Sequence, residues 1–456
     1  MAFSMTLLAY SILEYTSQLS AAGQLDYAQT ALQWGTDFFI KAHVSPNKLW
    51  GQVGNTSDHA CWERPEDMDT PRPAYFIDAA NPGSELAGET AAALAAASIV
   101  FKASDPAYSA LCLLHATQLF SFADTYRGTY SDSIPAADAF YHSYGGYKDE
   151  LAWAAAWLYR ATGSATYLSY LLTNDAALGV STSKVSVFSW ADKTAGAQLL
   201  MAKVYLSGKY DTSNAALTSM LQNYKAGIDS YVCANVPDNP LHSVKTSPEG
   251  LLYFGEVNSQ YVTGAAFLVS VHSDYLATYA STLTCGAAVL SPATTFAFSK
   301  AQMDYILGVN SARTSYMVGF SPTYPQQAHH RGASNPSIYA QPPFTGCAQT
   351  YSLFYSSPDP NPNVHVGAIL GGPDAVSCHC HLASLRLISI PLRFIFILNT
   401  SICPSPSSPS PSPPSLQTDK YTDLRSNANQ NEPTTYINSG AVGVLAKLFT
   451  LSSPIM

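Results

Sequence analysis

Charged residues are scarce in this chain of 456 residues, because Asp, Glu, Lys and Arg together make up only 12% of it. Acidic residues outnumber basic ones, so the net charge is −9 and the isoelectric point is near 5.6. Lys and Arg do not form the clusters that contacts with nucleic acid phosphates require. The composition argues against nucleic acid as a partner. With a hydrophobic share of 47%, it favours a large core under a mostly uncharged polar surface.

The eight cysteines lack the spacing of a zinc site. No Cys-x-x-Cys pair occurs, and Cys378-His379-Cys380-His381 is too tightly spaced for ordinary tetrahedral ligation. The even number permits disulfides without assigning any pair. No basic segment followed by a cleavage site opens the chain, since residues 5–15 predict an amphipathic helix that ends near Glu14. We therefore expect the signal of a secreted form to lie upstream of Met1.

Residues 375–418 differ in character from the sequence around them. Their apolar part is interrupted by Arg386, Pro391 and Arg393 before it reaches the length of a membrane helix. A Pro/Ser tract at 404–415 follows, and such a composition cannot pack a core. We expect no membrane anchor here and interpret the segment as an insertion, either disordered or a retained intron translated in frame.

Apolar residues recur at three- and four-residue spacing along most of the chain, which predicts helices. The helical ranges expected from this spacing are 3–20, 24–43, 84–102, 108–126, 147–161, 195–207, 213–230, 260–281 and 297–307. Within them, residues 90–100 are small and apolar on every side, as in a helix buried on most faces. Few and short strands are expected. The pattern predicts an all-α fold with buried inner helices.

Long connections rich in Pro, Gly, Asn, Asp and aromatic residues separate these helices at 44–83, 127–146, 232–257 and 309–374. Loops of this length are uncommon in a compact domain unless they carry function. The chain also contains 29 Tyr, beside 6 Trp and 19 Phe. An aromatic ring with a polar tip suits the wall of a cleft, although helix crossings also use it. We expect the loops to form the walls of a cleft.

Several motifs follow one another in a fixed order. They are Trp62-Glu63-Arg64-Pro65-Glu66-Asp67-Met68, Pro82-Gly83-Ser84-Glu85, Gly146-Tyr147-Lys148-Asp149-Glu150-Leu151, Met303-Asp304-Tyr305-Ile306-Leu307-Gly308, Gly371-Gly372-Pro373-Asp374 and Asn431-Glu432-Pro433-Thr434-Thr435-Tyr436. Together the chain resembles glycoside hydrolase family 9, the plant-, algal- and bacterial-type endo-β-1,4-glucanases. The resemblance implies an (α/α)6 barrel, a six-hairpin toroid with an open substrate cleft, formed by residues 1–374 and 419–456.

By its place in the family motif, Glu432 is expected to be the general acid of an inverting hydrolysis, in which a second carboxylate activates water. An acid must keep its proton, and Asp423 is a candidate neighbour that would raise its pKa. The alternative for Glu432 is a carboxylate at a helix start, stabilised by the helix dipole. In the family the base lies in an Asp-Ala-Gly-Asp turn, which occurs nowhere in these residues. We interpret this as an N-terminally incomplete sequence.

The resemblance also implies substrate-binding residues. His329 and Arg331 would hold sugar hydroxyls, since Arg offers a fork of donors and His a compact one. His59 and Trp62 resemble a stacking platform. Further cleft candidates are Tyr141, Tyr144, Trp190 and Tyr261. The alternatives are a solvated basic turn for the first pair and core packing for each aromatic residue.

The main functional hypothesis is therefore an endo-β-1,4-glucanase, secreted in its full-length form, that acts on a β-1,4-glucan without a redox or nucleotide cofactor. Calcium remains open, as does a preference for mixed-linkage glucan or xyloglucan, and monomer is the default. The alternative is a catalytically inactive glucan-binding protein on the same barrel. The insertion at 375–418 precedes the Glu432 motif, and a displacement of about 1 Å there could cost on the order of 100-fold in rate.

Overall fold

Six long helices pack side by side in a closed ring in the computed structural model, which describes residues 1–374 and 420–452. Each contacts the next in the order α1 (Ala2–Glu14), α4 (Ser84–Phe101), α8 (Lys148–Thr162), α10 (Thr194–Ser207), α12 (Ser259–Thr278) and α17 (Thr435–Ser452), and α17 closes the ring against α1. A second layer follows the ring. Its helices, each packed against the inner helix that precedes it, are α3 (Leu25–Ala42), α5 (Pro106–Thr125), α9 (Ala165–Leu178), α11 (Ala215–Asn235) and α13 (Pro292–Ile306).

The inner helix α4 shows why this sequence packs so closely. All residues from Ala91 to Ala97 are fully buried, and α4 contacts α1, α5 and α8. Small side chains allow these neighbours to approach from several directions. At Gly88 a Cβ atom would lie 3.2 Å from the carbonyl oxygen of Glu150, so the α4–α8 contact there needs a glycine or a shift of its partner. α4 is long and apolar enough to cross a membrane, but 83% of it is buried inside the fold.

Capping residues mark the first turn of two outer helices, α5 and α13. Asp105 accepts a hydrogen bond from the backbone N–H of Tyr108 at 2.9 Å, and Pro106 occupies the first turn of α5. Ser291 caps α13 in the same way through the N–H of Thr294 at 3.1 Å. A capping side chain satisfies one of the free N–H groups of the first turn, and proline has no N–H to satisfy.

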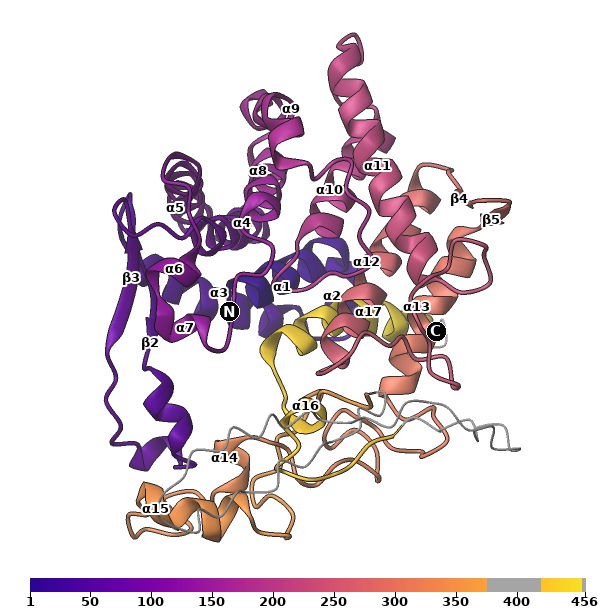
Figure 1. The fold of residues 1–456 in the computed structure, drawn as a ribbon. Coiled ribbons are helices and arrows are strands. Elements are labelled where there is room, and N and C mark those ends of the chain that lie inside the picture. Colours follow the sequence, from indigo (N-terminus) through magenta and orange to yellow (C-terminus); the bar gives the residue numbers. More distant parts are fainter. Residues whose placement is uncertain (375–419, 453–456) are drawn as a thin grey trace, which may run out of the picture.

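Short elements occupy the connections. They are α2 (Thr16–Ala21), α6 (Tyr130–Ser133), α7 (Pro135–Asp138), α14 (Arg331–Ser334), α15 (Cys347–Thr350), α16 (Ala428–Asn431), the 3-10 turns Thr56–Ala60 and Pro65–Asp67, and a π-helical turn, Tyr351–Tyr355. Strands β1 (His43–Ser45), β2 (Lys48–Val53) and β3 (Ala74–Asp78) form an antiparallel sheet, and β4 (Leu283–Cys285) pairs with β5 (Ala288–Leu290). In Figure 1 the short helices α14, α15 and α16 gather at one end of the molecule.

The helical prediction is confirmed in most segments and wrong in identifiable places. The range 3–20 is two helices that meet at Tyr15, and α1 is buried nearly all round instead of amphipathic. Helix α13 begins at Pro292, five residues before the expected start. Helices α9 and α17 were not expected from the spacing. The loop 44–83 contains the three-stranded sheet, while the interpretation of 375–418 concerns residues outside the described part.

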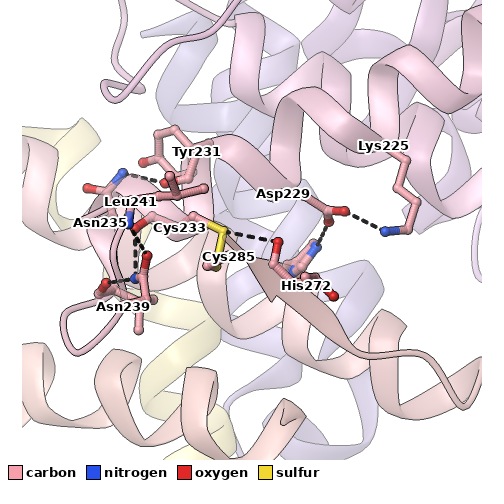
Figure 2. Close-up of a disulfide and its surroundings, with 11 residues drawn as sticks. Lys225, Asp229, Tyr231, Cys233, Asn235, Asn239, Leu241, His272 and Cys285 are labelled. Carbon is pink, nitrogen blue, oxygen red and sulfur yellow. Dashed lines mark hydrogen bonds and ion pairs between the residues drawn. A yellow bond between two sulfur atoms is a disulfide. The ribbon is translucent and has the colours of Figure 1, made fainter. Parts of the chain in front are cut away.

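A disulfide between Cys233 and Cys285 connects the outer helix α11 to the β4–β5 hairpin. Figure 2 shows it beside Asn239, which donates to the carbonyls of Cys233 and Val236 at 3.0 and 2.6 Å. On the neighbouring turn of α11, Asp229 contacts His272 of the inner helix α12 at 2.9 Å. These contacts fix an outer helix to the layer within.

Candidate active site

Glu432 lies on the short link between α16 and the inner helix α17. Its backbone N–H donates to the carbonyl of Ala428 at 2.9 Å, which closes the last turn of α16. Helix α17 begins at Thr435, so Glu432 precedes the helix start by three residues. Helix α16 before it is held by the glycine motif: the backbone N–H of Gly372 donates to the carbonyl of Gln430 at 2.9 Å. At Gly371 a Cβ atom would lie 2.1 Å from the carbonyl oxygen of Asn429, so only glycine fits there.

The surroundings of Glu432 favour the protonated carboxyl. Desolvation raises its pKa above the ordinary value, and the imidazole of His329 acts in the opposite direction. Glu432 is nevertheless exposed to solvent. A carboxyl that is partly desolvated yet accessible has the properties that a general acid requires.

Asp423 does not act on Glu432 as expected. Its carboxylate accepts hydrogen bonds from the backbone N–H groups of Gln326 and Gln327 at 2.7 and 3.0 Å. It is not among the groups that shift the pKa of Glu432. Asp423 therefore fastens the turn before His329, and desolvation raises the pKa of Glu432 in its place.

Tyrosines from one connection and from two inner helices meet beside Glu432. Tyr141 interacts electrostatically with the Glu432 carboxylate and hydrogen-bonds to Tyr436, the first-turn tyrosine of α17. Tyr436 interacts in turn with Tyr261 of α12, and Tyr261 with Tyr144. The ring of Trp190 lies 5.1 Å from that of Tyr141, at 73°. The structure thus brings together four aromatic residues expected in the cleft, of which Tyr141 and Tyr144 are 47% and 78% exposed.

His329 lies on the turn that leads into α14, and Arg331 is the first residue of that helix. The backbone N–H of His329 donates to the carbonyl of Asn431, next to Glu432, at 2.8 Å. Arg331 extends in another direction, where its terminal nitrogens contact both oxygens of Asp58 at 2.9 and 3.3 Å. This ion pair holds the pKa of Asp58 below its ordinary value. Arg331 therefore joins the His329 turn to the Asp58-His59 turn.

The structure distinguishes His59 from Trp62, although the sequence grouped them as one platform. The His59 ring stacks on Phe140 at 3.8 Å and 16°. Trp62 is only 7% exposed; its indole N–H donates to Ser334 at 2.7 Å, and its ring packs edge-on against His329 at 4.7 Å. The indole therefore has little surface left for a sugar, and it packs against the His329 ring.

Three residues of this region escaped the sequence interpretation. Tyr436 stands four residues after Glu432 in the same motif and could have been found from it. Tyr355, whose ring packs 4.9 Å from that of Trp62, and Arg425, which is 2% exposed, are brought there by chain folding alone. No local pattern marks them, because their partners lie tens of residues away.

Within residues 1–374 and 420–452, one group of side chains has ligand atoms close enough for a metal ion: Cys61, Glu63 and Cys347. Cys61 and Cys347 form a disulfide, so their sulfurs are not thiolate ligands. The expectation about calcium stays a prediction.

The fold agrees with solved structures of known proteins. The endoglucanase of the termite Nasutitermes takasagoensis is 37% identical, with a TM-score of 0.76 over 99% of this chain and 85% of that one. Endoglucanase CelQ of Clostridium thermocellum, solved with cellobiose and cellotriose, is 25% identical, with a TM-score of 0.71 over 100% of this chain and 63% of that one. The predicted (α/α)6 barrel is confirmed.

The family model described as glycosyl hydrolase family 9 matches residues 1–445. The chain belongs to that family. Endoglucanase 5 of Arabidopsis thaliana is 44% identical over 98% of this chain and 64% of its own length. The chain thus spans a little under two thirds of the length of this and similar plant relatives.

Proposed function

We propose that this chain is the catalytic barrel of an endo-β-1,4-glucanase, a glycoside hydrolase that cleaves internal bonds of cellulose-like polysaccharides by inversion. The observation that carries the proposal is Glu432, a carboxyl with a raised pKa that stands between an aromatic wall and His329. The substrate class is supported by the similarity to CelQ, which was solved with cellobiose and cellotriose.

In this proposal the Glu432 carboxyl protonates the glycosidic oxygen as the bond breaks, so that the leaving sugar departs as a neutral alcohol. Tyr141, Tyr144, Trp190 and Tyr261 present faces and hydroxyls to successive sugar rings. Nε2 of His329 and the turn that Arg331 holds bind hydroxyls near the cleaved bond. Inversion also requires a carboxylate that activates water on the opposite face. The family's motif for that base is absent from this sequence.

Residues 1–374 and 419–456 would form one catalytic domain interrupted by 375–418. Two disulfides, Cys61–Cys347 and Cys233–Cys285, favour an oxidising compartment, which fits a secreted protein that acts on extracellular glucan. The proposed partner is the polysaccharide or its oligosaccharides, with the protein acting as a monomer and outside a membrane.

The test compares the chain with Glu432→Gln in two assays, hydrolysis of carboxymethylcellulose and binding of cellotetraose. We expect the variant to keep binding and thermal stability while hydrolysis falls at least about 100-fold, the lower range for loss of an acid catalyst. Glu66→Gln is the matched control, since Glu66 is exposed on the Pro65–Asp67 turn and should leave both assays unchanged.

The pH dependence of hydrolysis gives a second test of the same proposal. The acid must be protonated to act, so hydrolysis should decline as pH rises through the raised pKa of Glu432. Hydrolysis by Glu432→Gln at the level of the unaltered chain would remove Glu432 from the acid role. Binding of cellotetraose without hydrolysis by the unaltered chain would instead favour the inactive glucan-binding protein.

A further inference from the structure

Arg425 is buried on the segment that leads to Glu432, and its side chain pairs with carbonyl and amide oxygens instead of carboxylates. Its side chain donates six hydrogen bonds, at 2.6 to 3.2 Å. The acceptors are the backbone carbonyls of Phe354, Tyr355, Ser357 and Asp359 and the side-chain oxygen of Asn361, which receives two. Desolvation lowers the pKa of Arg425, against the charges of Asp423 and Asp359. Burying a cation among dipoles costs free energy, so its hydrogen bonds must offset the lost hydration.

The geometry explains why this position suits arginine. The guanidinium is a planar fork with five N–H donors, one of which is shared between two acceptors, and here it reaches around the whole turn 354–361. A lysine ammonium carries three donors on one atom and could not reach the same set of acceptors. Asn361 extends the connection, because its own amide donates to the carbonyl of Ala328 at 2.9 Å, immediately before His329.

The backbone carbonyl of Arg425 makes a separate contact with His329. Nδ1 of the imidazole lies 2.7 Å from that oxygen. A carbonyl can only accept, so Nδ1 carries the hydrogen and, in the neutral ring, Nε2 is left with a free lone pair. The second ring nitrogen is therefore the one that remains for substrate.

Further bonds hold His329 and Arg425 in register. The backbone N–H of Arg425 donates to the side-chain oxygen of Gln327 at 3.3 Å. The side-chain amide of Gln327 in turn donates to the carbonyl of Pro358 at 2.9 Å. Tyr355, whose carbonyl Arg425 binds, packs its ring against Trp62, which supports the His329 ring. The turn 354–361 and the turn that carries His329 are thus both bonded to Arg425, and the imidazole is held at Nδ1 and against the Trp62 ring.

We propose that Arg425 is a positioning residue that holds His329 in the Nδ1–H tautomer and directs Nε2 toward substrate beside Glu432. Arg425 itself touches no substrate. The consequence for catalysis rests on the proposed function, whereas the tautomer is a property of the free protein. The two can therefore be tested separately.

The experiment is Arg425→Lys in the full chain, with 15N-labelled histidine and NMR spectra that report which ring nitrogen carries the proton. Loss of one signal in His329→Gln assigns the resonance. We expect a single Nδ1–H tautomer at His329 in the unaltered chain above the pKa of histidine. In the variant we expect a mixture of tautomers. Hydrolysis of cellotetraose should fall on the order of 100-fold in kcat, as expected for a misplaced group.

Arg160→Lys is the matched control, because Arg160 is an arginine of α8 that pairs with Glu14 away from His329. It should lower thermal stability and leave the His329 tautomer unchanged. Asn361→Ser is a milder variant for the case in which Arg425→Lys does not fold, since it removes the acceptor of two of the six bonds; a smaller shift toward the mixture is expected.

An unchanged His329 tautomer in Arg425→Lys, or in Asn361→Ser if the first variant does not fold, would overturn the proposal. So would an unaltered chain in which Nδ1 carries no proton at neutral ring charge. Absence of hydrolysis in the unaltered chain counts against the proposed function alone, because the NMR result still decides the role of Arg425.

Discussion

The ring of inner helices and the loop end of the barrel are stabilised in different ways. In the ring, contiguous apolar residues are removed from water, as in the fully buried run from Ala91 to Ala97. At the loop end, the connections 309–374 and 420–434 are held by hydrogen bonds between buried polar groups, with Arg425 and Asn431 2% and 0% exposed. Burial of apolar surface tolerates small shifts, whereas a hydrogen bond weakens steeply with geometry. The loop end is therefore the part in which single substitutions should change function more than folding.

The ring nevertheless contains charged clusters, and the one around Lys193 offers the largest expected effect. Lys193, 1% exposed at its side chain, contacts Glu150 at 2.9 Å and Glu89 at 3.5 Å. Burial alone would lower its pKa, but these carboxylates outweigh burial and raise it. Lys193→Met should leave both acids buried without their lysine partner and destabilise the protein by about 3–5 kcal/mol. Chemical denaturation measures this.

Lys203→Met is the matched control for that variant. Lys203 is one-third exposed and shares Glu14 with Arg160, so Glu14 keeps a partner after the change. A loss below about 1 kcal/mol is expected there. Equal losses for the two lysines would show that the buried cluster has no special weight in the ring.

The same contrast explains what the sequence could predict. Apolar spacing identified α4, α8 and α12 to within three residues, because the apolar residues that bury a helix recur at short, regular intervals along the chain. It missed α9 and α17, and it placed the start of α13 too late by overlooking the Ser291-Pro292 cap. Glu432, Tyr141 and Tyr261 were proposed as site residues through resemblance to a family. Arg425 was not, since its acceptors lie 64 to 71 residues away in sequence and only the folded chain assembles them.

Removing the two disulfides is expected to have an intermediate effect; one disulfide lies in the barrel and the other at its loop end. Cys233–Cys285 fastens α11 to a hairpin of the barrel, and Cys61–Cys347 joins the Trp62 loop to α15 at the loop end. Replacing either pair by serine should cost about 2–4 kcal/mol. We expect only Cys61→Ser/Cys347→Ser to weaken cellotetraose binding as well, because Cys61 adjoins Trp62. Calorimetric melting and titration with cellotetraose, run on both double variants, measure the two effects. Equal loss of binding in both would contradict the regional difference.

The smallest effect is expected from deleting residues 375–419 and joining the ends through a short glycine linker. Asp374 and Lys420 pair as an antiparallel bridge, so the ends of the segment already lie side by side. Gln430 fastens both ends, donating to the Asp374 carboxylate at 2.6 Å and to the Lys420 carbonyl at 2.9 Å. Shortening a loop changes closure entropy slowly, by about 0.6 kcal/mol per halving.

The melting temperature of the deletion variant should therefore stay within a few degrees of that of the full chain, and the contacts of Gln430 should persist. Deleting 309–330 instead serves as the contrasting control: it removes the turn that Asp423 holds and should abolish cooperative melting. If the 375–419 deletion also failed to fold, the segment would be part of the barrel's structure, and the interpretation of 375–418 as an insertion into one domain would be wrong. A normal melt with altered cellotetraose binding would show that the segment acts on the loop end, where a small movement of the Glu432 link would change substrate binding.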